Sequence, residues 1–106
     1  RSNGIWRIAL TTNVETPIGE LPALGQNIPN PFSGSTTIPL TLPQQTWLEL
    51  SVFDAVGMYI RTIWRGEKPA GTHQFEFAAS DLPPGIYVAR LMTESGVASR
   101  LMTIVR

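Results

Sequence analysis

Short runs in which apolar and polar residues alternate dominate the chain. In one of them Leu48, Leu50 and Val52 alternate with Glu49 and Ser51, which is the period of a strand buried on one face. Runs of this kind predict strands over residues 36–42, 46–54, 58–65, 72–79, 85–93 and 97–105, with a shorter extended piece near 26–32. No stretch keeps a helical spacing of apolar residues for three turns, so helix is a minor component.

The same alternation predicts which side chains face the core. The inward set is Leu48, Leu50, Val52, Phe75, Phe77, Tyr87, Ala89, Leu91, Met102 and Ile104. Proline has no N–H to offer a neighbouring strand, so Pro39 predicts that residues 36–42 form an edge strand.

Glycine, proline and aspartate separate the runs. Residues 54–57 and 94–96 are typical of tight hairpins, and residues 69–71 and 81–85 of two further turns. The carboxylates of Asp54 and Asp81 are each expected to accept hydrogen bonds from N–H groups of the turn that follows. Short antiparallel strands at this spacing predict an all-β fold, an immunoglobulin-like antiparallel β-sandwich of about seven strands.

The first quarter of the chain has a different character. Residues 13–25 mix Pro, Gly and acidic side chains without periodicity, which is typical of a linker, and residues 5–12 are compatible with one strand before it. We therefore assign residues 1–24 to the end of a preceding region and its linker, and residues 25–106 to the domain. The chain begins without Met and without a signal peptide, so we expect the native amino terminus to lie upstream.

Composition excludes several classes of function. The 106 residues carry 8 Lys and Arg against 8 Asp and Glu, and a net charge of zero gives no attraction for nucleic acids or anionic membranes. No apolar run is long enough to span a bilayer. There is no cysteine, and the single histidine, His73, has no second ligand, so it is expected to be a surface residue or the partner of a backbone carbonyl. We expect no metal, no cofactor and no catalytic centre, because no nucleophile with a base and no carboxylate pair is apparent.

Aromatic side chains raise one binding alternative. Trp47, Trp64 and Tyr59 would stack on sugar rings if they formed a flat platform, as in a carbohydrate-binding module of a glycosidase. Their places on the predicted strands do not align them, so packing or contact with a protein partner is the favoured interpretation.

Four motifs carry a resemblance to a known family. Residues 24–38 contain Gln-Asn-Ile-Pro-Asn-Pro-Phe, and this segment resembles the opening of the C-terminal sorting domains of the type IX secretion system. An apolar strand ending in Asp and Gly, an Ala-Gly-Thr-His turn and a Leu-Pro-Pro-Gly-Ile-Tyr segment follow in the family's order and extend the resemblance over residues 24–106. The motif residues are Pro29, Asn30, Pro31, Phe32, Asp54, Gly57, Gly71, Gly85 and Tyr87. Physically, the two prolines predict an extended segment that places Phe32 at the base of the sandwich, with the Asn30 side chain capping the bend.

The resemblance implies a non-catalytic export signal at the end of a larger cargo protein. Such a domain passes through the periplasm, is read by an outer-membrane translocon, and is removed by a sortase-like surface peptidase, which leaves the cargo at the cell surface or secreted and often attached to lipopolysaccharide. By the same resemblance the signal lies in residues 97–106, where we expect Arg100, Thr103 and Arg106 to be the outward or terminal recognition residues. Exposed backbone favours cleavage within residues 13–26.

Two departures and one further alternative accompany the resemblance. The chain has Phe77-Ala78 where the family often has Trp-Asp, and Arg100 and Arg106 where it usually has Lys, a change that matters because the two cations bind differently. The similar immunoglobulin-like domain of flagellar hook-capping proteins shares the Pro-Asn-Pro-Phe opening. That family usually has a longer Gly-rich insert before its Gly-x-Tyr strand, and here only residues 79–84 stand there.

Overall fold

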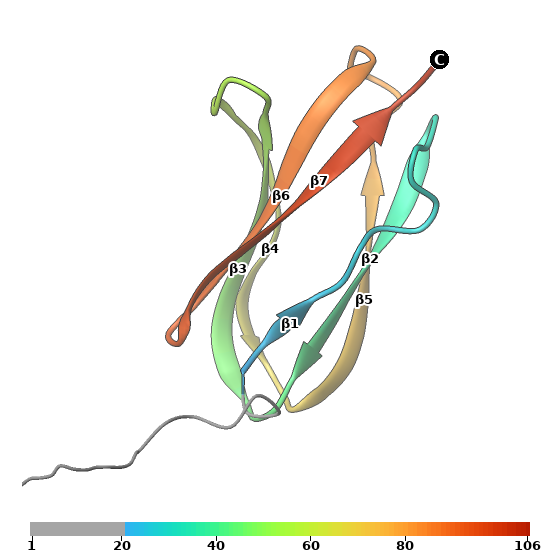
Figure 1. The fold of residues 1–106 in the computed structure, drawn as a ribbon. Coiled ribbons are helices and arrows are strands. Elements are labelled where there is room, and N and C mark those ends of the chain that lie inside the picture. The colour runs from blue at the N-terminus through green and yellow to red at the C-terminus, as the bar shows by residue number, and fades with distance from the viewer. Residues whose placement is uncertain (1–20) are drawn as a thin grey trace, which may run out of the picture.

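A computed structural model describes residues 21–106, which form two packed antiparallel sheets without a helix in this part of the chain. The strands are β1 (Ala23–Leu24), β2 (Ser35–Leu42), β3 (Thr46–Asp54), β4 (Tyr59–Lys68), β5 (Gly71–Ala78), β6 (Gly85–Thr93) and β7 (Gly96–Ile104). One sheet has the order β1-β2-β5 and the other β4-β3-β6-β7 (Figure 1). The predicted all-β antiparallel sandwich of about seven strands is confirmed.

The six longer strands lie where the alternation of apolar residues predicts them, and each end is within three residues of its prediction. The amino-terminal part differs. Residues 26–32 form two isolated bridges, at Ile28 and Phe32, rather than a strand, and β1 lies just upstream of Gly25. Leu24, which the sequence places in the linker, is buried in the sandwich.

The core lies between the two sheets and contains every side chain predicted to face inward. Sheet β1-β2-β5 adds Leu24, Ile38, Leu40 and Leu42. Phe32 is 2% exposed and meets the edge of the Phe77 ring, with 6.2 Å between ring centroids. The prediction that Phe32 is buried in the sandwich is confirmed.

The prediction that Pro39 lies in an edge strand is wrong, because β2 has β1 on one side and β5 on the other. The Pro39 carbonyl accepts a hydrogen bond from the Gly25 N–H at 2.9 Å, on the side of β1. In an antiparallel strand the N–H of a residue points to the same side as its carbonyl, so the missing donor faces the end of a two-residue strand. The proline therefore costs little in a central strand.

The turn after β3 follows its prediction. Oδ1 of Asp54 accepts hydrogen bonds from the N–H groups of Val56 at 3.0 Å and Met58 at 2.9 Å. Gly57 has a φ of 94°, a conformation that favours glycine. The hairpin between β6 and β7 is also formed, with Thr93 paired to Gly96.

Two other polar side chains have different outcomes. His73 contacts a backbone carbonyl, as predicted, with Nε2 2.8 Å from the Pro69 oxygen. No hydrogen bond from the following turn to the Asp81 carboxylate is found among residues 21–106. The carboxylate pairs instead with Arg61 on β4, at 2.7 Å.

The two ends of the described chain lie at opposite ends of the sandwich. Residue 21 enters beside the β2–β3 and β4–β5 connections, and β7 runs away from it to the carboxyl end (Figure 1). Within this part of the chain no helix has the length and apolar character to cross a membrane.

Candidate functional site

The terminal strand β7 forms one edge of the four-stranded sheet. Its register with β6 is continuous from Gly96 to Ile104. The N–H of Thr103 donates to Asn30 Oδ1 at 3.0 Å, and its carbonyl accepts from the Phe32 N–H at 3.0 Å, so the peptide groups of Thr103 face away from β6. Backbone direction alternates along a strand, so those of Val97, Ser99 and Leu101 face away from β6 as well. The side chains of these residues lie on the outer face of the sheet.

Residues 26–32, which we call the motif segment, run along the last part of this edge. The side-chain amide of Gln26 donates to the Leu101 carbonyl at 2.8 Å, across 75 positions of sequence. Phe32 pairs with β7 in parallel, through its N–H to Thr103 and through its carbonyl to the Val105 N–H at 2.8 Å. The motif segment and the terminal strand therefore form one site.

Asn27 holds the motif segment in shape. It is 2% exposed, and its Nδ2 donates to the Pro29 carbonyl at 3.0 Å and to Thr36 Oγ1 at 3.1 Å. The Thr36 hydroxyl donates to the same Pro29 carbonyl at 2.7 Å. The peptide bonds before Pro29 and Pro31 are both cis. The prediction that the Asn30 side chain caps its own bend is wrong, because its Oδ1 accepts from the Thr103 N–H on β7 instead.

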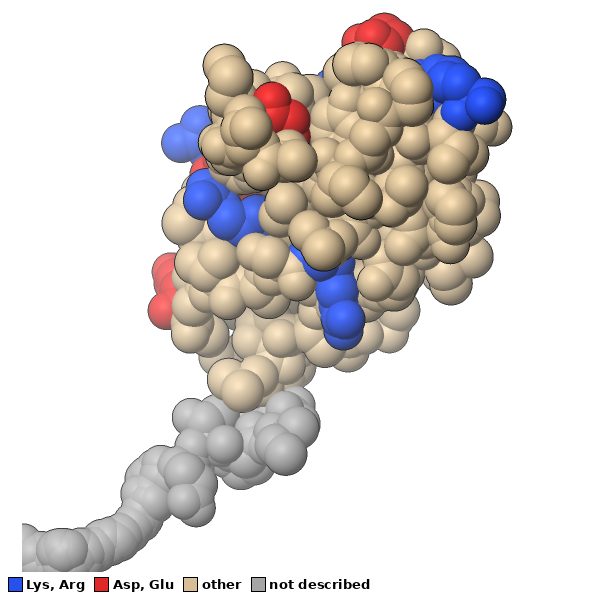
Figure 2. All heavy atoms as spheres, turned by 45° about the horizontal axis from the view of Figure 1, so that its top comes forward, with Lys and Arg blue, Asp and Glu red and all other residues tan. Residues whose placement is uncertain are grey.

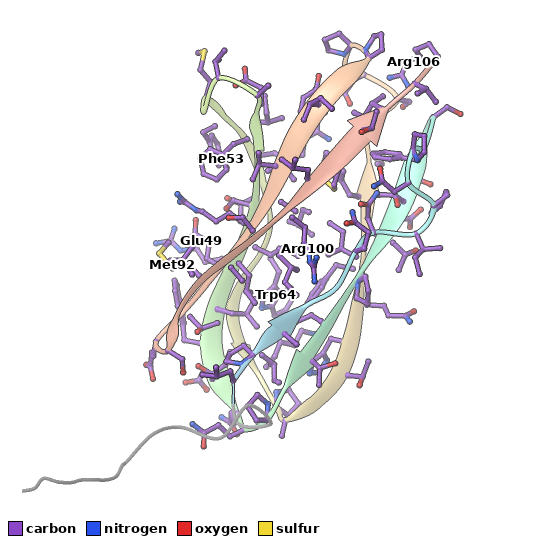
Figure 3. All side chains as sticks on the ribbon, viewed as in Figure 1. Glu49, Phe53, Trp64, Met92, Arg100 and Arg106 are labelled. Atoms are coloured by element: carbon purple, nitrogen blue, oxygen red, sulfur yellow. The ribbon has the colours of Figure 1, made fainter. Side chains whose placement is uncertain are left out.

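Arg100 does not point outward, contrary to the prediction. It pairs with Ala89, a buried residue, so its side chain starts on the inward face of β7 together with Met102 and Ile104. Figure 3 shows it between β7 and β1. Its Nε donates to the Leu24 carbonyl at 2.9 Å. Arg100 thus links the edges of the two sheets, although as a residue it is exposed.

Arg106 ties the end of the chain to the connection between β5 and β6. Its Nη2 donates to the Ala79 carbonyl at 2.9 Å and also to the Leu82 carbonyl. Both cations expected to serve recognition therefore already bind backbone carbonyls. Thr103 is half-buried, with its side chain on the outer face.

The other motif residues shape turns and the core. Asp54 and Gly57 form the β3–β4 turn, and Gly71 and Gly85 begin β5 and β6. Tyr87 is buried, and its hydroxyl donates to the Pro83 carbonyl at 2.8 Å. Two of the motifs lie against the terminal strand. Residues 26–32 run along its edge, and in the last motif Gly85 pairs with Ile104 and Tyr87 with Met102. Sequence reasoning assigned no role to the Gln26 and Asn27 side chains, although both stand in the quoted motif.

The surface around β7 is apolar and carries little charge. Val97 and Leu101 are each 61% exposed, and Ile86 on the same face pairs with Thr103, towards the other end of β7 from Val97. Arg90 lies over the Phe53 ring, 4.3 Å from its centroid. In the face drawn in Figure 2 the charged side chains are scattered, and charges of one sign do not gather in one patch. The described residues contain no group of three potential metal ligands.

The aromatic side chains do not form a platform. Trp64 pairs with Leu50 and packs against the core, whereas Trp47 pairs with Glu67 on the opposite, outer face. Tyr59 lies near the far end of the sheet, where its ring meets the edge of Phe53. The described residues thus lack the flat stacking surface that a carbohydrate-binding module requires.

Comparison with known families connects these features. A family model described as a secretion system C-terminal sorting domain matches residues 27–105, from the motif segment to the end of β7. The chain belongs to this family. No curated protein matches it. The match covers residues of both the motif segment and the terminal strand. Membership of the type IX sorting domains implies a cargo protein, the secretion machinery, and export to the cell surface or the medium. Sorting domains of this family are in general non-catalytic.

Proposed function

We propose that this sorting domain is a folded export signal for a larger cargo protein, read by an outer-membrane translocon after transit through the periplasm. In this assignment the residues before β1 connect it to the cargo. One observation carries the proposal: the motif segment and the terminal strand of a sorting domain build a single site along one sheet edge. Such an edge suits recognition, because it offers backbone groups and a row of alternate side chains to a receptor.

We assign recognition to residues 97–106, with different roles for the three expected residues. Thr103 lies on the outer face of β7, where a receptor has access to it. Arg100 and Arg106 act as positioning residues, because their guanidinium groups hold the strand to Leu24 and to the β5–β6 connection. Arginine suits this task, since its planar group offers several donors in fixed directions.

Removal of the domain by a sortase-like surface peptidase belongs to the same proposal, with the cargo left attached to lipopolysaccharide or released. The expected window of cleavage is residues 13–26, of which 13–20 lie outside the described residues. Within the described part, Leu24 is buried and its carbonyl is bonded to Arg100, which disfavours cleavage there. We therefore place the cut before Ala23. A new carboxyl terminus of the cargo within residues 46–93, found by mass spectrometry, would contradict this.

The test is export of a reporter protein fused to the whole chain. The wild-type fusion should reach the cell surface or medium of a host with a type IX system, and failure to do so would refute the export function. Thr103→Glu should abolish export without lowering the melting temperature. The matched control is Thr41→Glu, the same change at an exposed position of the other sheet, which should leave export intact.

Arg100→Ser and Arg106→Ser separate positioning from direct contact. Because both remove contacts within the domain, each should lower the melting temperature together with export. If Thr103→Glu and both arginine variants export normally, the receptor reads another face of the sandwich.

A further inference from the structure

The first part of the β7 edge is open. From Leu101 onward the motif segment occupies the edge, as described above. Among residues 21–106 no backbone or side-chain group is bonded to the edge-facing N–H and C=O groups of Val97 and Ser99. Val97 and Ser99 are two residues apart on β7, so these groups point in the same direction, away from β6 in the plane of the sheet.

A hollow lies beside this open stretch, at the corner where the two sheets part. It has a volume of about 140 Å³ and is lined mainly by carbon atoms of Leu21, Pro22, Leu91, Thr93, Val97 and Ala98. The cause is the sequence of β7, whose inward positions here are Ala98 and Arg100. Alanine is too short to reach the opposite wall, and the Arg100 guanidinium is bonded to Leu24. The hollow is partly open to the surface beside the β6–β7 hairpin.

Open strand edges in native proteins are commonly protected by lysine, proline or a bulge. The residues from Val97 to Ser99 carry no charge and no proline, and the register with β6 has no shift. Val97, which would meet an added strand on the outer face, is instead a large exposed apolar residue. The stretch thus has the features of an edge that accepts a strand.

We propose that the open edge and the hollow together bind one extended segment of the export receptor, as a fifth strand of the four-stranded sheet. The backbone of the segment pairs with Val97 and Ser99. Its residue opposite Ala98 points inward, as Ala98 does, and places an uncharged aliphatic side chain in the hollow. A charged side chain at that position would lose its hydration without a partner, so the hollow selects an aliphatic residue. This inference rests on the proposed function, and it states what kind of contact the receptor makes.

The chemistry is tested with a defined probe on the full 106-residue protein. The probe is a capped seven-residue peptide of alternating threonine and valine with leucine at its centre, and the control peptide has aspartate at the centre. The leucine peptide should slow hydrogen exchange of the Val97 and Ser99 amides. The aspartate peptide should bind about tenfold more weakly or worse, which corresponds to about 1.4 kcal/mol.

Two pairs of variants test the edge and the hollow separately. Ser99→Pro removes an N–H that faces away from β6, a position where an edge strand tolerates proline, whereas Ser99→Ala keeps the N–H. Ala98→Leu fills the hollow, and Ala78→Leu makes the same change at an exposed position of β5. With melting temperature as the check on folding, Ser99→Pro and Ala98→Leu should abolish peptide binding and reporter export. Ala78→Leu should retain both, and Ser99→Ala should lose far less than Ser99→Pro, because its N–H remains.

The outcomes distinguish this inference from the proposed function. If folded Ser99→Pro and Ala98→Leu bind the peptide and export the reporter as wild type does, the strand site is refuted while the export function stands. If the wild-type fusion is not exported but the leucine peptide binds in a Ser99-dependent way, the export function fails and the strand site remains. Protection of Val97 and Ser99 that rises with protein concentration without peptide would identify the occupant as a second copy and overturn the assignment to a receptor.

Discussion

At the scale of single residues, the Asp54 carboxylate shapes the β3–β4 turn by accepting two backbone N–H groups with one oxygen. Hydrogen bonds to a charged group contribute more than neutral ones, so Asp54→Ala should cost about 1–2 kcal/mol of unfolding free energy. Asp54→Asn keeps an acceptor in the same place and should cost less. A thermal melt measures both, at about 4–8 °C per kcal/mol for a domain of this size. Equal melting temperatures for wild type and Asp54→Ala would contradict the assignment.

The Asp81 carboxyl group provides a pH-dependent prediction. The pKa of Asp81 is lowered below its usual value. The main cause is the hydrogen bond from Arg61, and the second is a hydrogen bond from the backbone N–H of Asp81 itself. Because the folded pKa is depressed, the stabilisation is present at neutral pH and is lost as the pH falls through the folded pKa. Arg61→Gln should raise the pKa of Asp81 toward its usual value, as followed by NMR of the carboxyl carbon. An unchanged titration in that variant would show that the ion pair does not set the pKa.

Sequence reasoning at this scale succeeds where the partners are close in the chain. His73 contacts the carbonyl of a residue 4 positions away. Asp54 accepts from an N–H group 4 positions away, in the turn that follows it. Asp81 pairs across 20 positions, Asn30 across 73 and Arg100 across 76. Such partners are set by how the sheets pack, and the types of the residues do not specify them. The predicted outward direction of Arg100 failed for a different reason: Arg100 is two residues from Met102, so the alternation that places Met102 and Ile104 inward also places Arg100 on the inward face.

At the scale of elements, alternation was sufficient for the long strands and their inward faces, because burial on one face of a strand imposes a period of two. β1 has only two residues, which is too short for any period, and its place depends on pairing with Leu40 and Thr41. The proline rule misplaced β2 for the same reason. The sequence does not reveal that the neighbouring strand β1 has only two residues and ends before Pro39, so that no β1 carbonyl is left without an N–H donor there.

The close contact between Gly25 and Pro39 allows the pairing of β1 with β2 to be tested. A Cβ atom on Gly25 would lie 2.8 Å from Pro39 Cγ, and the ring cannot rotate away. Gly25→Ala should therefore cost about 1–3 kcal/mol, the range for overpacking. In a Pro39→Ala background the obstructing atom is gone, so the same change should cost less. A double-mutant cycle measured by denaturant unfolding gives the coupling, and additive effects would show that the ring is not the obstacle.

The assignment of inward faces predicts a contrast between buried and exposed positions. Phe32, Leu50 and Tyr87 are buried, so replacing each by Ala should cost about 2–5 kcal/mol. Leu101 is exposed on the outer face, and Leu101→Ala should change stability by about 0.5 kcal/mol or less. Unchanged melting temperatures for all three buried variants would mean that the faces are wrongly assigned.

At the scale of the whole molecule, the site exists only because the chain closes on itself. Residues 26–32 stand near the start of the sandwich and β7 at its end, and each is recognisable in the sequence as a separate element. Their adjacency follows from the position of β7 at the sheet edge and from the motif segment, which bridges to β2 at Ile28 and to β7 at Phe32. No local pattern encodes this arrangement, so the sequence indicated the parts of the site and the fold shows how they combine.

The extent of the folding unit is the last prediction. The family match begins at residue 27, whereas the sandwich also contains Leu24 at 5% exposure, the bond from Gly25 to Pro39, and the carbonyl that receives Arg100. Burial of one leucine side chain contributes about 1.5–3 kcal/mol, so a fragment of residues 27–106 should melt well below a fragment of residues 21–106. Leu24→Ala in the longer fragment should lower the melting temperature by only part of this difference, because Gly25, Gln26 and the carbonyl of residue 24 remain. Equal melting temperatures for the two fragments would show that β1 adds nothing to stability and that the unit begins where the family match does.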